Sequence, residues 1–495
     1  MALHRAGRLT EADEQYAAVL GAMPDHPQAL RLRGILARDT GNLARSVKLL
    51  RKAVDAADAD PEPAAELGLS YLASGYLQLA EMAFRKALAR DPESRKALAN
   101  LGTLLQYRGH IHGAIECHRQ CLALDPDDLD VRCNLANTLA EAGRGDEALA
   151  ECDVALAAAP GRPELLATRG AVLCALERYA DAAPVLEAAL ATGPDDMALS
   201  NLGMARQQLG QHAAAIAALD TAVRVNRDNA RATADLTTLL SEAGRSDAAL
   251  ELSAGFLARH PAEGLVLAAR GAALRDAGHA VEARQLVDLE GLVRLRKLPV
   301  PKGFADLREF NRRLAALIHA DPSLIASPRG KATRSGAQTG EFNPDSDPVL
   351  AALRDAFNRE LRGAIAELNA AGFGAHPAMA WATDRWTLRI WATVLGPGGH
   401  QTPHLHPLGW LSGVYYVQAP AGMCGDDGAL EFGVPPERVL VREAPDRRRI
   451  EAQEGRLVIF PSYFWHRTLP FTAPGDRISI AFDVMPARSY GLPGP

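Results

Sequence analysis

The pattern of hydrophobic and polar positions changes once along this chain, near residue 290. Before that point apolar residues recur three and four positions apart, which is the spacing of amphipathic helices. After it, short β-branched and aromatic runs alternate with Gly and Pro turns, which is typical of strands. We therefore predict a helical region followed by a region rich in strands.

The helical region carries an internal repeat of about 34 residues. One phase of the repeat is mostly glycine, at Gly34, Gly68, Gly102, Gly170, Gly203 and Gly271. Proline closes most repeats, at Pro92, Pro126, Pro160, Pro194 and Pro261. Small residues let two antiparallel helices approach closely, and proline ends the second helix. The spacing resembles the tetratricopeptide repeat (TPR), which implies an all-α superhelix over residues 1–290, with a partial repeat at 1–26 and about eight repeats from residue 27.

A row of amide side chains falls at one position of this repeat. Its members are Asn100, Asn134 and Asn201, with Asn137 one helical turn after Asn134. The row is similar to the asparagine ladder of the O-linked N-acetylglucosamine transferase superhelix, which implies a groove that holds an extended peptide backbone. We expect a protein or peptide partner in this groove. The alternative is that these residues are ordinary solvated polar positions.

The second region begins with two predicted helices, over residues 304–320 and 349–370, separated by a polar segment over 327–348 that we expect to be a long loop. Predicted strands follow, within residues 385–399, 410–420, 428–435, 455–466 and 476–486. Several short strands separated by turns favour a sandwich or jelly roll.

Two histidines two residues apart, His404 and His406, enter one of the apolar runs. In a strand, residues i and i+2 point to the same face, so both imidazoles can reach one point. His466 follows a later predicted strand, and Arg477 and Ser479 share one face of the last. A guanidinium directed into the domain interior requires an anionic partner.

The order His-x-His, strand, distant His and Arg-x-Ser resembles the Fe(II)/2-oxoglutarate oxygenases, and residues 298–488 resemble more closely those fused to TPR arrays. The resemblance implies an α+β domain with a double-stranded β-helix (jelly-roll) core over 346–488. Residues 291–345 would be a connecting helix and loop, and 489–495 a tail. It also implies a dioxygenase that uses Fe(II), 2-oxoglutarate and O2 to hydroxylate a substrate, releasing succinate and CO2.

Carried over to this chain, the resemblance makes His404 and His466 catalytic iron ligands. Arg477 would form a salt bridge to the distal carboxylate of 2-oxoglutarate, and Ser479 would add a hydrogen bond. Tyr415 and Tyr416 are expected to be one packing and one cavity-facing ring, and we assign Tyr416 to the cofactor pocket.

This chain departs from the family at the middle ligand, because His-x-His replaces the usual His-x-Asp or His-x-Glu. We favour His406 as the third ligand, since strand geometry places it on the face of His404. Asp426, Asp427 or Glu431 could instead supply a carboxylate, and His400 is a weaker candidate.

Two alternatives stay open. A cupin-type metal dioxygenase without 2-oxoglutarate fits the spacing of Gly398 to His404, but the cupin glutamate is absent where Trp410 and Leu411 stand. A scaffold that has lost catalysis would use the repeats to bring proteins together. Arg477 with Ser479 favours the oxygenase.

Composition and charge limit the kinds of partner and the cellular location that we expect. The net charge of -6 and pI near 6.2 give no basic footprint, so neither nucleic acid nor an anionic membrane is the expected partner. No signal-peptide core or long apolar window is found, and we expect a cytoplasmic protein. Cys117, His118 and Cys121 could suggest a metal site, but small buried helix residues are the favoured interpretation.

Overall fold

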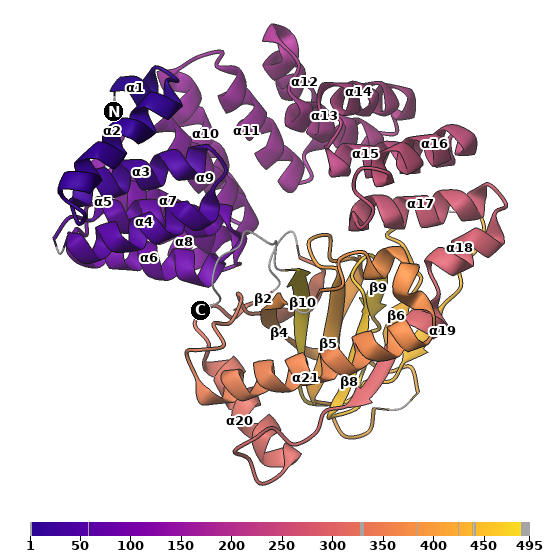
Figure 1. The fold of residues 1–495 in the computed structure, drawn as a ribbon. Helices are drawn as coiled ribbons and strands as arrows, with labels where there is room; N and C mark the ends of the chain where they lie inside the picture. The colour runs from indigo at the N-terminus through magenta and orange to yellow at the C-terminus, as the bar shows by residue number, and fades with distance from the viewer. Residues whose placement is uncertain are drawn as a thin grey trace. The chain divides into compact units, whose positions relative to one another are not determined.

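The computed structural model describes residues 2–57, 59–326, 331–383, 385–423, 425–437, 439 and 442–486 (Figure 1). The chain divides into two compact units, one holding the described residues up to Thr138 and the other running from Leu139 to Pro486. The first is helical, and the second holds further helices and a sheet domain. The predicted two-part layout, helical repeats followed by a domain with a sheet, is therefore confirmed.

The helical region opens with α1 (Ala2–Arg5) and α2 (Leu9–Ala22) and continues two helices to a repeat. These are α3 (Pro27–Asp39), α4 (Leu43–Ala56), α5 (Glu62–Ala73), α6 (Leu77–Arg90), α7 (Arg95–Tyr107), α8 (Ile111–Leu124), α9 (Leu129–Glu141), α10 (Gly145–Ala158), α11 (Pro163–Ala175), α12 (Tyr179–Ala189) with η1 (Leu190–Thr192), α13 (Asp196–Gln208), α14 (His212–Val225), α15 (Ala230–Glu242), α16 (Ser246–Leu257), α17 (Gly264–Asp276) and α18 (Ala280–Leu286).

The repeated glycines are the points at which the two helices of a repeat touch. A Cβ added at Gly34 would lie 2.6 Å from the Leu50 side chain, and one added at Gly68 would lie 2.4 Å from Phe84. The turn between the helices needs a positive φ, which Gly75 adopts at 79° and Glu177 adopts at 60° in the repeat that lacks this glycine. The sequence period thus records a packing requirement rather than a helix propensity.

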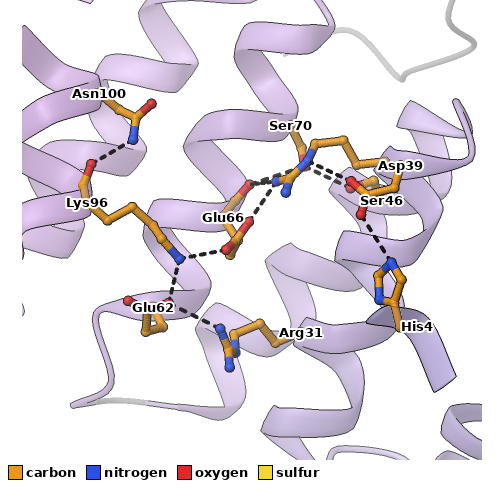
Figure 2. Close-up of polar contacts among 10 residues, drawn as sticks. His4, Arg31, Asp39, Ser46, Glu62, Glu66, Ser70, Lys96 and Asn100 are labelled. Atoms are coloured by element: carbon orange, nitrogen blue, oxygen red, sulfur yellow. Dashed lines mark hydrogen bonds and ion pairs between the residues drawn. The ribbon is translucent and has the colours of Figure 1, made fainter. Parts of the chain in front are cut away.

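In the first unit, charged side chains link successive first helices of the repeats. Lys96 of α7 donates to Glu62 and Glu66 of α5, each at 2.8 Å (Figure 2). Arg38 of α3 donates to Glu66 at 2.7 Å. Burial by itself would raise the pKa of Glu66, but the two cations hold it below its ordinary value.

The second unit ends in an antiparallel sheet domain. Its strands are β1 (Arg294–Lys297), β2 (Ile325–Ala326), β3 (Thr333–Gln338), β4 (Trp386–His404), β5 (Leu411–Gln418), β6 (Leu430–Phe432), β7 (Arg448–Ile450), β8 (Arg456–Pro461), β9 (His466–Thr468) and β10 (Arg477–Pro486). The order is β1-β8-β5-β10-β4-β9-β6-β7, with β3 pairing to β4 and to β2. The helices are α19 (Leu289–Leu292), α20 (Leu307–Ala320), α21 (Pro348–Ala370), η2 (Phe373–Ala375) and η3 (Pro377–Met379).

The long strand β4 makes the sheet curl. Its first part, Trp386 to Leu395, pairs with β10, whereas its last residues pair with β9, at Gln401 and His404. The register shifts between Gln401 and His404, and Gly398 takes a φ of 78° within the same strand. One strand therefore serves two parts of the sheet. The assignment of this curled sheet to the double-stranded β-helix stays a prediction.

The prediction of a long loop over 327–348 is wrong in part. Thr333–Gln338 forms β3 and pairs with β4, whereas 327–330 lie outside the described residues. At Gly336, which faces Leu395, an added Cβ would lie 2.5 Å from the Leu395 side chain. The polar, Gly-containing segment has no alternation of its own, because its partner strand rather than its own pattern makes it a strand.

The domain core lies between the sheet and its helices. Ile478, Ile480 and Phe482 of β10 are buried, and Phe482 packs on Phe357 of α21 with ring centroids 4.4 Å apart. Leu267 of α17 belongs to the same core cluster, so the last repeat is part of the domain packing. Among the described residues, no helix is both long enough and apolar enough to cross a membrane.

Candidate metal centre and cofactor pocket

Three histidines from distant segments converge inside the sheet domain. His404, His406 and His466 each offer a ring nitrogen within 4.8 Å of the others. The ring centroids of His404 and His466 are 4.3 Å apart, and those of His406 and His466 are 5.0 Å apart. Within the described ranges, no other group of His, Cys, Asp and Glu of this size has metal-binding spacing, and that includes the segment around Cys117 and Cys121.

Each imidazole is held by its Nδ1 atom. His404 donates Nδ1–H to the Thr402 carbonyl at 2.8 Å, and His466 donates to the Phe464 carbonyl at 2.9 Å. His406 Nδ1 lies 2.5 Å from Asp483 Oδ1. Since carbonyl and carboxylate oxygens only accept, Nδ1 carries a proton in all three rings, and Nε2 is the nitrogen of each ring that can bind a metal. This is the state in which imidazole binds a metal.

Burial keeps the imidazoles of His404 and His466 neutral. It lowers the pKa of His404 to about 3, with His406 adding repulsion. Burial, with His404 and His406 nearby, also places the pKa of His466 well below its ordinary value. Three imidazoles packed together fit a divalent cation of the Fe(II) or Zn(II) type.

His406 reaches the cluster by a different route from the one predicted. β4 ends at His404, so His406 lies in the connection to β5 and not on a common strand face. Its backbone N–H donates to the Ser462 carbonyl at 2.9 Å, which anchors the turn. The strand-alternation reason was therefore wrong, although the two rings do lie together, with centroids 5.3 Å apart.

The carboxylates considered as a third ligand lie elsewhere. Glu431 is buried, but its two oxygens bond Arg449 at 2.7 Å and Arg467 at 2.6 Å. Asp426 is exposed and also pairs with Arg449. Neither these two nor Asp427 belongs to the histidine group, and His400, whose Nδ1 lies 3.2 Å from the Gly398 carbonyl, is likewise outside it.

A second group of polar side chains, which is buried, lies along the same sheet face. Arg477 is 1% exposed, its guanidinium carbon is 4.9 Å from the Tyr416 ring centroid, and its Nη1 lies 3.5 Å from Ser479 Oγ. Arg477 Nε and the Tyr416 hydroxyl have no hydrogen-bond partner within the part of the chain that the structure describes. A buried cation and donors without acceptors fit an anionic ligand.

Strand register explains why these groups meet. Ser479 of β10 lies opposite Thr393 of β4 on one side and Tyr416 of β5 on the other. Thr393 is 1% exposed, and its Oγ1 also lacks a partner among the described atoms. Sequence reasoning missed Thr393, because nothing in its strand marks it until the register with Ser479 is known.

Asp483 is the other residue that sequence reasoning missed. It continues the alternation of Arg477, Ser479 and Ala481 by one step on β10, so extending that face would have found it. Burial by itself would raise its pKa, but His406 and the Ser412 hydroxyl hold it below its ordinary value.

The predicted asparagine row is divided between the two units. Asn100, Asn134 and Asn137 lie in the first, where Asn100 Nδ2 donates to the Lys96 carbonyl of its own helix at 2.7 Å (Figure 2). Asn201 lies on α13 in the second unit. All four are half-buried, and their role in a groove stays a prediction.

One cavity lies between the last repeats and the sheet domain. It is lined from α13, α15 and α17 and by Trp465, which directly precedes His466. Arg231, Asp235, Thr238 and Ala269 contribute to its walls, and Asp235 stands one repeat after Asn201. The cavity is therefore formed by the last repeats together with the residue that precedes His466.

The curled sheet, the three imidazoles and the buried arginine define a candidate metal-binding domain with an anion pocket. Residues 389–483 match the family model described as "Putative 2OG-Fe(II) oxygenase". Tetratricopeptide repeat models match residues 1–61, 64–94, 105–172, 169–230 and 200–252. The chain therefore combines TPR units with a C-terminal domain that matches the 2OG-Fe(II) oxygenase family.

Solved structures similar to this chain include TPR proteins. A tetratricopeptide repeat protein from Parabacteroides merdae is 17% identical, covering 48% of this chain and 93% of its own, with a TM-score of 0.43. YrrB, described as a TPR protein with an unusual peptide-binding site, is 21% identical, covering 38% and 97%, with a TM-score of 0.33. MamA is 23% identical, covering 32% and 92%, with a TM-score of 0.30. A search of curated proteins finds no match.

Proposed function

We propose that the protein is an Fe(II)- and 2-oxoglutarate-dependent dioxygenase that hydroxylates a protein or peptide substrate. The observation that carries the proposal is the pairing, on one sheet face, of three converging imidazoles with a buried Arg477 whose Nε has no partner within the described residues. The first set suits a metal and the second suits the far carboxylate of a dicarboxylic 2-oxo acid. The family match at residues 389–483 supports both.

Different residues would bind the metal and the 2-oxo acid. His404, His406 and His466 would hold Fe(II) through Nε2, and Arg477, Ser479, Thr393 and Tyr416 would bind 2-oxoglutarate. When bound, these cofactors supply the oxidising chemistry that consumes O2 and yields succinate and CO2. The chain's own contribution is to orient both groups and to keep water from the buried pocket.

Recruitment by the repeats is the finer part of the proposal. The cavity between α13, α15, α17 and Trp465 supports it, because a peptide bound there would lie against Trp465, the residue before His466. Alanine positions such as Ala269 leave room for a backbone, and Arg231, Asp235 and Thr238 offer polar groups at the walls.

The cofactor proposal is tested by anaerobic titration of the metal-free protein with Fe(II) and then 2-oxoglutarate, followed by the charge-transfer absorption of the complex. We expect a band in the wild type and none in Arg477→Ala at the same 2-oxoglutarate concentration. An iron-loaded wild type without a band would contradict it.

Recruitment is tested by succinate release in the presence of a peptide library. We expect the library to stimulate release in the wild type and not in Thr238→Arg, which fills the cavity. Val225→Glu on α14, an exposed position outside the cavity lining, is the matched control. Equal stimulation of all three proteins would contradict recruitment through this cavity.

A three-histidine dioxygenase that does not use 2-oxoglutarate is the second candidate. The observation that favours it is the absence of a carboxylate from the metal-binding group in the described residues. It requires O2 consumption that is independent of 2-oxoglutarate and unaffected by Arg477→Ala.

A further inference from the structure

The side chain of His406 is held by a buried carboxylate. Its Nδ1 lies 2.5 Å from Asp483 Oδ1, and both side chains are 9% exposed. Ser412 Oγ donates to the same Asp483 oxygen at 2.7 Å and lies 2.8 Å from Ser462 Oγ. The turn that carries His406 is itself bonded to the Ser462 carbonyl, so ring, carboxylate and turn form one connected network.

This contact is made at Nδ1, which leaves Nε2 as the ring nitrogen of His406 that can bind a metal. A carboxylate at Nδ1 fixes the tautomer with the proton on Nδ1, directs Nε2 toward the cluster and makes that nitrogen a stronger donor. His404 and His466 have only backbone carbonyls at this place. His406 is therefore the imidazole of the three whose Nδ1 contacts a formal charge.

Charge accounts for the position of this carboxylate. Three neutral imidazoles leave the full double charge of a divalent cation in a buried site, which is costly. Arg389, which lies opposite Asp483 in the register of β4 and β10, forms an ion pair with Glu341 and also acts on Asp483, whereas Asp483 Oδ1 itself contacts His406. One anion next to a ligand restores the net charge that a His, His, carboxylate set would give.

We propose that Asp483 supplies the negative charge of this metal centre without binding the metal itself. It is a positioning residue that acts through its contact with His406 Nδ1. The inference rests on the proposed function, because it requires that the three histidines bind Fe(II). It also explains how the centre works with His-x-His, since the anion missing from the motif stands on β10 instead.

The test is Fe(II) affinity, measured by anaerobic titration of the full-length protein. Asp483→Asn keeps the size and an oxygen acceptor but removes the charge, and we expect it to weaken Fe(II) binding about 10- to 100-fold. Asp426→Asn, the same change at an exposed carboxylate, should leave affinity unchanged. With iron saturating, Asp483→Asn should bind 2-oxoglutarate at least as tightly as the wild type, because the site has gained positive charge, and its Fe(III)/Fe(II) potential should rise.

The outcomes separate the two proposals. A wild type that binds no Fe(II) overturns the proposed function and this inference with it. A wild type that binds Fe(II) as tightly as Asp483→Asn overturns the inference alone. A lower melting temperature of metal-free Asp483→Asn, with unchanged Fe(II) affinity and unchanged potential, would assign Asp483 to the fold and would also overturn it.

Discussion

His404 at the end of β4 lies directly opposite His466 at the start of β9, with the two ring centroids 4.3 Å apart. Antiparallel pairing fixes this neighbourhood through the backbone, so these two imidazoles stay together without the third. His406 depends instead on a turn and on Asp483. His404 and His466 are therefore the rigid part of the candidate metal centre.

Removing the imidazole of either His404 or His466 should strongly weaken metal binding. We expect His404→Ala and His466→Ala each to lower Fe(II) affinity by about 100-fold or more. This loss exceeds the one expected for a residue such as Asp483, which contacts a ligand but not the metal. The measurement is metal content and affinity after anaerobic loading. His400→Ala is the matched control, because His400 lies on the same strand outside the group, and a loss of iron there would count against this ligand set.

Arg477 should govern the affinity for 2-oxoglutarate. Loss of a buried charge-assisted contact costs about 1.5–3 kcal/mol, so Arg477→Ala should raise the KM for 2-oxoglutarate about 10- to 150-fold. Arg477→Lys should lie between the two, since it keeps the charge but loses the planar fork. Steady-state succinate release checks this, and an unchanged KM in both variants would show that Arg477 does not bind 2-oxoglutarate.

The Thr393 hydroxyl should contribute less than Arg477 to 2-oxoglutarate affinity, and its removal should not destabilise the cofactor-free protein. Thr393→Val removes a buried hydroxyl with no partner in the described structure, so the cofactor-free protein should be as stable as the wild type or more so. The KM for 2-oxoglutarate should rise about 3- to 10-fold, the loss of one hydrogen bond. Thermal melting without cofactor and succinate kinetics give the two readouts. A destabilised variant with normal KM would place the hydroxyl in the packing instead.

His118 should make the first unit sensitive to acid. The ring is 0% exposed, and a Cβ added at Gly102 would lie 2.6 Å from it, where other repeats place Leu50 or Leu186. Neither ring nitrogen has a partner among the described atoms. Burial lowers its pKa from 6.5 to about 4.

As the pH falls, His118 binds a proton at a higher pH in the unfolded chain than in the folded one, so acid favours unfolding. Stability is complete above pH 6.5 and falls as the pH drops from 6.5 toward 4. At pH 5 the loss is about 2 kcal/mol. His118→Leu should remove this dependence and stabilise the protein at neutral pH as well. Urea unfolding at pH 7.5 and pH 5 measures it, and equal pH dependence in both proteins would contradict the assignment.

The local elements were largely predictable from the sequence. Helices expected over 304–320 and 349–370 are observed as Leu307–Ala320 and Pro348–Ala370, because an apolar stripe at helical spacing is a local signal. The face of β10 that carries Arg477 and Ser479 followed from alternation for the same reason. The identities of His404, His406 and His466 came from motif order, and the structure brings the three together.

Tertiary structure decided what no local pattern encodes. β3 is a strand because β4 pairs with it, and Thr393 joins Ser479 and Tyr416 only through the register of three strands. His406 reaches its neighbours through a turn anchored at Ser462 and a carboxylate on β10. Periodicity assigns a side chain to a face, whereas contacts between distant segments decide what lies opposite it. The sequence by itself thus determined the repeats, the strands' faces and the three histidines, and the long-range pairing of the sheet decided the geometry in which they meet.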